Sequence, residues 1–293
     1  MHKPVLLETV LSYLELKPGH VALDATIGSG GHAEAILKAI GSQGRLIGLD
    51  QDVLALERVR NHLVGFEKQV ILKHLNFRYL DQVLFELNFK QVHAVLLDVG
   101  VSSEQLEDPE RGFSFQLDGP LDMRMDSTGS RKAEDIIAQV SLYELTTIFR
   151  KFGEERYARR IAEAIVNART RAPIQTTGAL KALIERAVPI YYLRGRIHPA
   201  TRVFQALRIV VNDELGALEE ALPKAFDFLE PGGRLAVISF HSLEDRIVKR
   251  FFVKQKQSGL GKVITKKPIV ATSEEIGENP RSRSAKLRVI ERS

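Results

Sequence analysis

The first hundred residues alternate between short apolar runs and longer amphipathic segments, and this alternation constrains the fold more than any other feature. Short, continuous apolar runs are typical of buried strands, whereas the segments between them have helical periodicity. Strands joined in this way predict a parallel sheet covered by helices on both faces. The expected strands are residues 21–25, 44–50, 70–76, 93–100 and 233–240, and the first helices are 31–40, 52–64 and 78–87.

The pattern changes after residue 240. Residues 241–253 predict one more helix, and residues 262–270 and 285–292 predict two closing strands joined by a loop rich in Gly, Pro, Ser and Arg. We expect these two strands to form an antiparallel pair at the end of the sheet. Dinucleotide-binding halves do not close in this way.

About 100 residues between the fourth and fifth expected strands carry no strand pattern. Residues 108–130 predict a long loop, whose apolar side chains either form part of a binding pocket or pack the insertion against the core. Four helices are expected next, the first opened by a Ser141–Glu144 capping box and the last by Pro199. We therefore predict an α/β domain formed by residues 1–107 and 211–293. A helical insertion at 108–210 would be its recognition domain.

Positive charge is concentrated in two segments of the chain. The formal net charge is only +5, yet residues 150–210 carry 13 Lys and Arg against 4 Asp and Glu. Residues 246–293 have the same balance, so each segment is +9. Two basic segments beside an acidic remainder favour a polyanionic partner such as nucleic acid. Solvated helix faces and a loose basic tail would give the same composition.

Several classes of protein are disfavoured by composition. The chain has no cysteine, which excludes a disulfide framework, thiol catalysis and cysteine-ligated zinc. No apolar run reaches the ~18 residues of a membrane helix, and the start of the chain lacks the features of a secretory signal. No two histidines have a metal-ligand spacing. We expect a cytoplasmic monomer or homodimer, with no membrane partner and no metal.

A glycine-rich turn follows the first expected strand, in the stretch VALDATIGSGGHAEAIL. Gly28, Gly30 and Ala33 fit the pattern G-x-G-x-x-G/A, and Asp50 ends the next strand at the spacing of a ribose-binding acid. This pattern alone does not separate NAD from S-adenosylmethionine (SAM), because both ligands carry an adenosine. Alternatively, Asp50 could cap the helix that follows it.

Two further side chains follow strands at the same predicted edge of the sheet. Phe77 comes directly after the third strand, where an aromatic ring can cover an adenine face or pack against the neighbouring helix. Asp98 ends the fourth strand at the switch point of the sheet, where ligands of open α/β sheets bind. A dinucleotide would require a second mononucleotide-binding half, but the chain continues into a basic helical insertion. SAM is therefore the favoured ligand.

Longer blocks of sequence are more specific than the glycine turn. They are HKPVLLETV, DATIGSGGH, LLDVGVSSEQLEDPERGFSFQLDGPLDMRMD, GEERYARRIAEAIV, HPATRVFQALRIVVNDEL, LEPGGRLAVISFHSLEDRIVKRFF and NPRSRSAKLRV. Through these blocks the chain resembles, from His2 to about Ile290, the bacterial 16S ribosomal RNA (cytosine-N4)-methyltransferase family, called RsmH or MraW.

This resemblance implies a class I SAM-dependent methyltransferase domain, an α/β Rossmann-like sheet, with an inserted all-helical domain. It also implies N4-methylation of a cytidine in the decoding region of 16S ribosomal RNA, within the small ribosomal subunit. The SAM contacts that it carries onto this chain are Gly30, Gly31, His32, Asp50, Phe77, Asp98 and Gln105.

The resemblance leaves the catalytic groups less defined than the ligand. Many amino-methyltransferases carry an Asp/Asn-Pro-Pro-aromatic run after the fourth strand, whereas this chain has DVGVSS. Asp98 is the candidate catalytic residue, as the acceptor of the target amine and of its proton. Ser102 and Ser103 are alternatives. His241 either contacts the substrate or caps its helix.

The insertion carries the candidate contacts to the RNA backbone. They are Arg156, Arg159, Arg160, Arg194, Arg196 and Arg202. Two other functions remain open at this point: a non-catalytic RNA-binding protein of ribosome assembly and, with less support, an NAD-dependent oxidoreductase. Tight SAM binding would argue against both.

Overall fold

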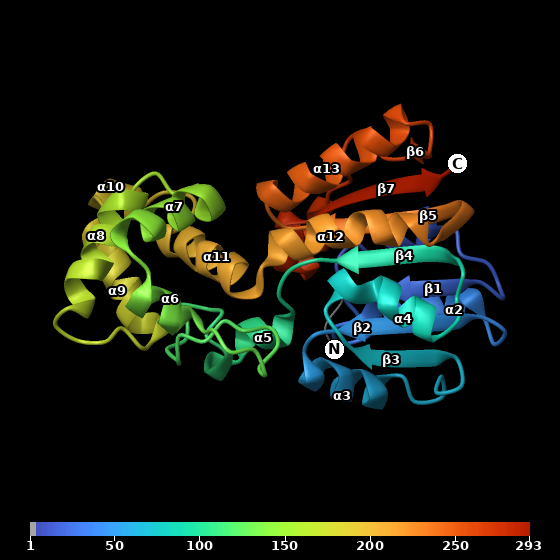
Figure 1. Cartoon of the computed structure of the whole chain (residues 1–293), viewed down its shortest axis with the longest axis horizontal. Helices are drawn as coiled ribbons and strands as arrows, with labels where there is room; N and C mark the ends of the chain where they lie inside the picture. Colours follow the sequence, from blue (N-terminus) through green and yellow to red (C-terminus); the bar gives the residue numbers. More distant parts are fainter. Residues whose placement is uncertain (1–3) are drawn as a thin grey trace. The chain divides into compact units, whose positions relative to one another are not determined.

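The computed structural model describes residues 4–293 and divides them into two compact units (Figure 1). The first unit contains the described residues up to Gly100 together with Leu215–Ser293, and the second is Val101–Glu214. The second unit therefore extends beyond the predicted insertion at both ends. One reason is that Val101 and Leu106 pack against the apolar core of the second unit.

The first unit is built on a sheet whose strands, within residues 4–293, have the order β3-β2-β1-β4-β5-β7-β6. Strands β1 to β5 are parallel, β7 is antiparallel to β5, and β6 is antiparallel to β7. The strands are β1 (Val21–Asp24), β2 (Arg45–Asp50), β3 (Val70–His74), β4 (Val92–Asp98), β5 (Leu229–Ser239), β6 (Gly261–Val263) and β7 (Lys286–Arg292).

The predicted sheet is confirmed except in its last part. The strand expected at residues 262–270 is short, because only Gly261–Val263 pairs continuously with β7. Further along, Ile269 forms an isolated bridge with Leu287. Helix α14 (Ser273–Glu278) and the 3-10 turn η3 (Pro280–Ser284) then lead into β7.

Helices pack on both faces of the sheet because alternate strand residues point to opposite sides. Leu23, Ile47 and Val95 belong to one apolar cluster, and their neighbours Ala22, Leu46 and Leu96 to another. The first cluster includes residues of α4 (Leu80–Glu86), α12 (Glu214–Asp227) and α13 (Ser242–Gln257). The second includes residues of α1 (Leu7–Leu14), α2 (Gly31–Ile40) and α3 (Val53–His62).

The second unit is helical, and none of its described residues lies in a strand, although Pro120 and Thr176 form an isolated bridge. Its elements are α5 (Ser103–Glu107), η2 (Pro109–Arg111), α6 (Ala133–Gln139), α7 (Leu142–Gly153), α8 (Ala158–Arg169), α9 (Thr177–Ala187), α10 (Ile190–Leu193) and α11 (Pro199–Asn212). The four expected helices correspond to α7, α8, α9 and α11. The Ser141–Glu144 capping box is formed at the start of α7.

The long loop at residues 108–130 contributes to the core of the second unit. Phe113, Leu121, Met123 and Met125 are all buried in one apolar cluster with residues of the surrounding helices. Packing was one of the two roles considered for these side chains, but the core that they join is that of the second unit itself.

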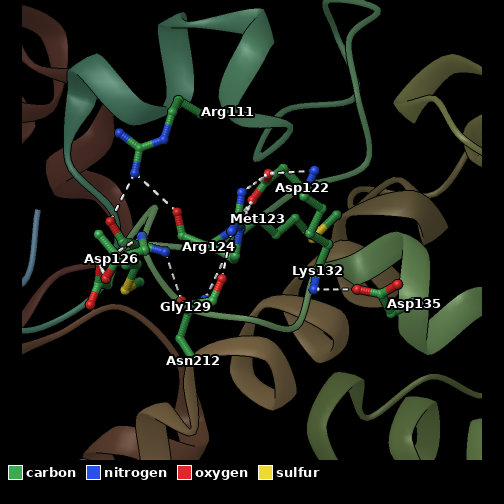
Figure 2. A network of polar contacts seen from close by, with 11 residues as sticks. Arg111, Asp122, Met123, Arg124, Asp126, Gly129, Lys132, Asp135 and Asn212 are labelled. Atoms are coloured by element: carbon green, nitrogen blue, oxygen red, sulfur yellow. Dashed lines mark hydrogen bonds and ion pairs between the residues drawn. The ribbon is translucent and has the colours of Figure 1, made fainter.

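The backbone of this loop is fixed by side chains that lie far away in sequence (Figure 2). Met123 has a left-handed conformation with φ of 63°, which is rare for a residue with a side chain. Asn212, at the end of α11, donates from Nδ2 to the Met123 carbonyl (2.8 Å) and accepts at Oδ1 from the Met125 amide (2.7 Å). The guanidinium of Arg111 donates to the carbonyl oxygens of Arg124 and Met125. These contacts hold a strained turn in place.

A second set of contacts orders the next part of the same loop. The guanidinium of Arg124 donates to both carboxylate oxygens of Asp122, at 2.8 and 2.7 Å, and to the Gly129 carbonyl. Lys132 Nζ lies 3.7 Å from the same Asp122 carboxylate. Bonds from side chains therefore order this segment in place of a strand or helix.

Candidate active site

Three strands of the first unit end in an aspartate at one edge of the sheet. Asp24 ends β1, Asp50 ends β2 and Asp98 ends β4. These strands are parallel, so their carboxyl ends meet at the same edge. The strand order reverses between β1 and β4, and ligands of open α/β sheets bind beside such a reversal.

The glycine turn between β1 and α2 leaves its backbone accessible at this edge. Gly28 and Gly30 have φ of 51° and 87°, and no side chain caps the start of α2. A Cβ atom on Gly31 would lie 2.3 Å from Pro4 Cγ. Glycine at these positions therefore serves both the left-handed turn and the close approach of another part of the chain.

Asp50 ties this turn to the next strand. Its Oδ2 accepts from the Gly28 amide (2.9 Å) and its Oδ1 from the Asp52 amide (2.8 Å). The cap of α3 is Asp52, which accepts from the Leu54 amide, so the capping role considered for Asp50 belongs to its neighbour. Burial raises the pKa of Asp50 to about 6. A carboxylate has about four lone-pair sites, so Asp50 can still accept from ribose hydroxyls.

Asp98 has a buried oxygen that lacks a hydrogen-bond partner. Its amide donates to Thr26 Oγ1 (2.6 Å), but its Oδ1 has no partner among the described residues. Burial, followed by the nearby Asp24 and Glu244 carboxylates, raises the pKa of Asp98 to about 8. An unsatisfied buried acceptor costs about 1–3 kcal/mol, which a donor on a bound ligand would recover.

His32 is buried beside Asp98 and is held in one tautomer. Its Nε2 lies 3.0 Å from the Val5 carbonyl oxygen, which can only accept, so Nε2 carries the hydrogen. Burial lowers the pKa of His32 to about 4, and the imidazole is neutral at pH 7. Its Nδ1 therefore has a free lone pair, and this atom lies 3.7 Å from Asp98 Oδ2.

Asp24 was not among the residues predicted from the sequence. Its side chain is almost fully buried, and burial together with the charge of Asp50 raises its pKa to about 7. Its Oδ1 accepts from the Thr26 amide. The signal was available, because Asp24 ends a buried parallel strand just as Asp50 and Asp98 do.

The remaining predicted residues lie in different surroundings. Phe77 begins the 3-10 turn η1 (Phe77–Tyr79) after β3, where it is half-buried against the core. His241 is the N-cap of α13 and accepts at Nδ1 from the Glu244 amide, in agreement with its capping role. Gln105 belongs to the second unit, in α5, where it forms a capping box with Ser102.

Comparison with known protein families assigns the chain to one of them. A family model described as the MraW methylase family matches residues 1–293. The chain belongs to this family.

Curated relatives of this methylase are similar over almost its whole length. They are called ribosomal RNA small subunit methyltransferase H in Heliobacterium modesticaldum (48% identity), Heliobacterium mobile (50%) and Syntrophotalea carbinolica (49%). Each comparison covers 99% of this chain and 98% of the relative. The comparison with a solved rRNA methylase from Streptococcus thermophilus covers 100% of this chain and 98% of that protein's chain, with a TM-score of 0.45 at 12% identity. That structural likeness is too distant to carry an argument.

The first unit of this methylase is a class I, Rossmann-like methyltransferase domain, and its cofactor is SAM. The residues at the edge of the sheet fit that cofactor. SAM carries a sulfonium and an ammonium group, and a cluster of buried carboxyl groups with raised pKa values is suited to positive charge. The unpartnered Asp98 Oδ1 offers an acceptor to a donor on the ligand. None of the helices within residues 4–293 combines the length and apolarity needed to cross a membrane.

Proposed function

We propose that this methylase transfers the methyl group of SAM to the exocyclic N4 atom of a cytidine in the decoding region of 16S ribosomal RNA. The observation that carries the proposal is the Asp98 carboxyl, with its unpartnered oxygen, in a chain about half identical to small-subunit rRNA methyltransferases. Such a substrate places the reaction in the cytoplasm, on the small ribosomal subunit or its RNA.

SAM supplies an electrophilic methyl group, and the first unit provides most of the residues proposed to hold it. The backbone of Gly30 and Gly31 would approach the methionine portion, since these residues carry no side chain of their own and no side chain caps the start of α2. Asp50 would accept from the ribose hydroxyls and Phe77 would cover the adenine. His32 and Asp98 complete the set that the first unit provides.

The chemistry requires a group that orients the target amine. The lone pair of a cytosine amine is delocalised into the ring, so the amine reacts only when an acceptor holds it with the lone pair toward the methyl group. Good positioning can account for roughly 7–11 kcal/mol of a barrier in favourable systems. In our proposal, ionised Asp98 accepts an N4–H bond at Oδ1. As the carbon–nitrogen bond forms and the carbon–sulfur bond breaks, Asp98 takes the released proton.

His32 fits a positioning role for this carboxyl group. Its Nδ1 can only accept, because Nε2 donates to the Val5 carbonyl. Before the reaction, a protonated Asp98 can therefore direct its Oδ2 hydroxyl toward Nδ1, 3.7 Å away. Loss of that proton gives the ionised Asp98 that accepts the target amine at Oδ1, and the proton released by the amine then goes to Oδ1.

The second unit is proposed to bind the RNA. Of the six arginines expected to do so, Arg159 pairs with Glu163 (2.9 Å) and Arg202 donates to the Tyr192 hydroxyl (2.9 Å). The others are exposed: Arg156, Arg160, Arg194 and Arg196. Exposed guanidinium groups on one helical unit are suited to phosphate contacts, which supply the salt-dependent part of RNA affinity.

Incubation with labelled SAM tests the proposal. Naked 16S RNA and small-subunit particles lacking the modification are each incubated with the wild-type chain and with Asp98→Asn, and nucleosides are identified by mass spectrometry. We expect N4-methylcytidine with the wild type and very little with the variant. A different methylated nucleoside, or label in neither substrate despite tight SAM binding, would overturn the assignment.

A further inference from the structure

One end of the second unit carries exposed aromatic and arginine side chains together. We call it the arginine–tyrosine patch, and it is made of residues from the start of α8 and from α10 and the loop after it. Its members are Arg156, Tyr157, Arg160, Tyr191, Arg194 and Arg196. The two segments meet because the Tyr157 hydroxyl is hydrogen-bonded to the Tyr191 hydroxyl.

A buried network beneath the patch fixes its two segments. The Tyr192 hydroxyl contacts both carboxylate oxygens of Glu155, at 2.9 and 3.1 Å, and accepts from Arg202 Nη1 (2.9 Å). Glu155 is buried, and its Oε1 also accepts from the Tyr157 amide (2.7 Å). The Tyr157 and Tyr192 rings meet edge to face with centroids 4.7 Å apart. The patch therefore stands on a rigid base.

The charge on the patch is not neutralised by nearby acids. The guanidinium of Arg156 lies over the Tyr157 ring, 5.7 Å from its centroid. The guanidinium groups of Arg160, Arg194 and Arg196 make no hydrogen bond or ion pair with any described residue. Glu155 is committed to the network below, so the exposed surface is positive.

The apolar exposure of the patch is also unusual. The side chain of Tyr191 is 62% exposed and that of the adjacent Ile190 is 68% exposed. Large aromatic groups of this kind are ordinarily buried, and here one is exposed on a unit end that also carries exposed arginines. Aromatic faces interleaved with positive charge bind single-stranded nucleic acid, because bases stack on the rings while phosphates meet the cations.

We propose that the arginine–tyrosine patch binds an unpaired stretch of the substrate RNA, with a base stacked on Tyr191 and phosphates on the flanking arginines. A duplex does not fit the same surface, since bases paired within an A-form helix cannot stack on a tyrosine. The inference rests on the proposed function, and it names the part of the RNA that the second unit recognises.

Tyr191→Ala and Tyr191→Phe test the stacking. We expect Tyr191→Ala to weaken binding of a single-stranded oligonucleotide from the 16S decoding region by about 5- to 150-fold, measured by fluorescence anisotropy. Tyr191→Phe keeps the ring and should bind within a few-fold of the wild type. Affinity for a duplex of equal length should not change. The matched control is Tyr143→Ala, which removes an 80% exposed tyrosine of α7.

Arg160→Glu with Arg194→Glu tests the phosphate contacts. Each lost contact should flatten the slope of log affinity against log salt by about 0.7 for single-stranded RNA. Arg60→Glu with Lys68→Glu makes the same change in net charge on the first unit, outside both basic segments, and should leave the slope unaltered. SAM affinity and thermal stability are measured on every variant to exclude misfolding.

The outcomes separate the two proposals. If the wild-type chain methylates the RNA but Tyr191→Ala binds and methylates single-stranded RNA as the wild type does, the patch assignment is wrong and the proposed function stands. Equal losses in Tyr143→Ala and Tyr191→Ala, or an equal loss of duplex binding, would also overturn the patch. If the wild type methylates no RNA, the proposed function itself fails.

Discussion

His32 directs a bare Nδ1 atom toward Asp98 Oδ2 across 3.7 Å, while its Nε2 is fixed 3.0 Å from the Val5 carbonyl oxygen. The Nδ1 atom can accept a hydrogen bond from a protonated carboxyl group but cannot donate one to a carboxylate. In our proposal Nδ1 is the acceptor toward which a protonated Asp98 turns, across a separation longer than a hydrogen bond. This relationship leads to the first prediction.

Replacing His32 with Ala should move the pH profile of methyl transfer. Without the Nδ1 acceptor, protonated Asp98 loses a partner and its pKa falls, so the limb on which the rate rises with pH should shift to lower pH. The turnover number at saturating SAM and RNA, measured from pH 5 to 9, reports this shift. His62→Ala, which removes a histidine bonded to Glu34 on the same unit, is the control. A uniform loss of rate with an unmoved limb would mean a structural role only.

Asp98→Asn should separate chemistry from cofactor binding. The amide keeps the shape of the carboxyl group but cannot take the proton of the amine, and general-base groups contribute about 10²- to 10⁴-fold in rate. We expect turnover to fall within that range while SAM affinity, measured by calorimetry, falls much less. Proportional losses in turnover and affinity would make Asp98 a cofactor ligand alone.

The SAM-free protein should lose a stabilising contribution as pH rises through the pKa of Asp98. In the folded chain this pKa is about 8, above its ordinary value of 3.8, so the folded state binds the proton more tightly than the unfolded state. The contribution is complete below pH 4 and is lost between pH 4 and 8. Asp98→Asn should therefore gain stability relative to the wild type between pH 5 and 9 in urea unfolding. If the stabilities of Asp98→Asn and of the wild type changed with pH in parallel, the raised pKa of Asp98 would be contradicted.

Asp50→Ala should weaken SAM binding by about 10- to 150-fold, because it removes a charge-assisted contact worth roughly 1.5–3 kcal/mol. It should also lower the melting temperature, since the Gly28 and Asp52 amides lose their acceptor. Calorimetry and thermal unfolding measure the two effects. Glu86→Ala, which removes an exposed carboxylate of the same unit, should change neither. If Asp50→Ala bound SAM as tightly as the wild type does, Asp50 would not belong to the SAM site.

Arg159→Glu and Arg160→Glu should have different effects on the salt dependence of RNA binding, although the two residues are adjacent. Arg159 already pairs with Glu163 on the helix surface, whereas Arg160 has no partner among the described residues. Such an exposed pair contributes little to stability. We expect Arg160→Glu to flatten the salt slope of RNA binding by about 0.7–0.9 and Arg159→Glu to change it less. Equal changes would show that both side chains reach the RNA.

The sheet and the position of its site were predictable because they depend on local patterns. Short apolar runs defined the parallel strands, and Asp50 and Asp98 could be placed together because the carboxyl ends of parallel strands share an edge. The glycines in the turn after β1 were also informative, because a left-handed backbone and a close approach of another group both favour glycine. Helix α12 was missed, and it contains Pro223, a residue that ordinarily interrupts helices.

Properties set by distant contacts could not be read from the sequence. The tautomer of His32 depends on the carbonyl of Val5, and the left-handed turn at Met123 depends on Asn212. The pairing of Arg159 with Glu163 likewise depends on how the two side chains are placed on α8. The raised pKa of Asp98 likewise requires its burial and the neighbouring carboxylates to be known.

Strands β4 and β5 are neighbours in the sheet, with Asp98 beside Ile238, yet the whole second unit is synthesised between them. At about 5–20 residues per second, the ribosome takes roughly 6–20 s to make that unit. Throughout this interval the apolar edge of β4 has no partner strand, and an unpaired edge is a template for aggregation. Because helical units with local contacts fold much faster than this, the insertion can complete its own core while the sheet remains open. The nascent chain therefore passes through a stage in which the later-made unit can fold while the earlier-made sheet still lacks its fifth strand.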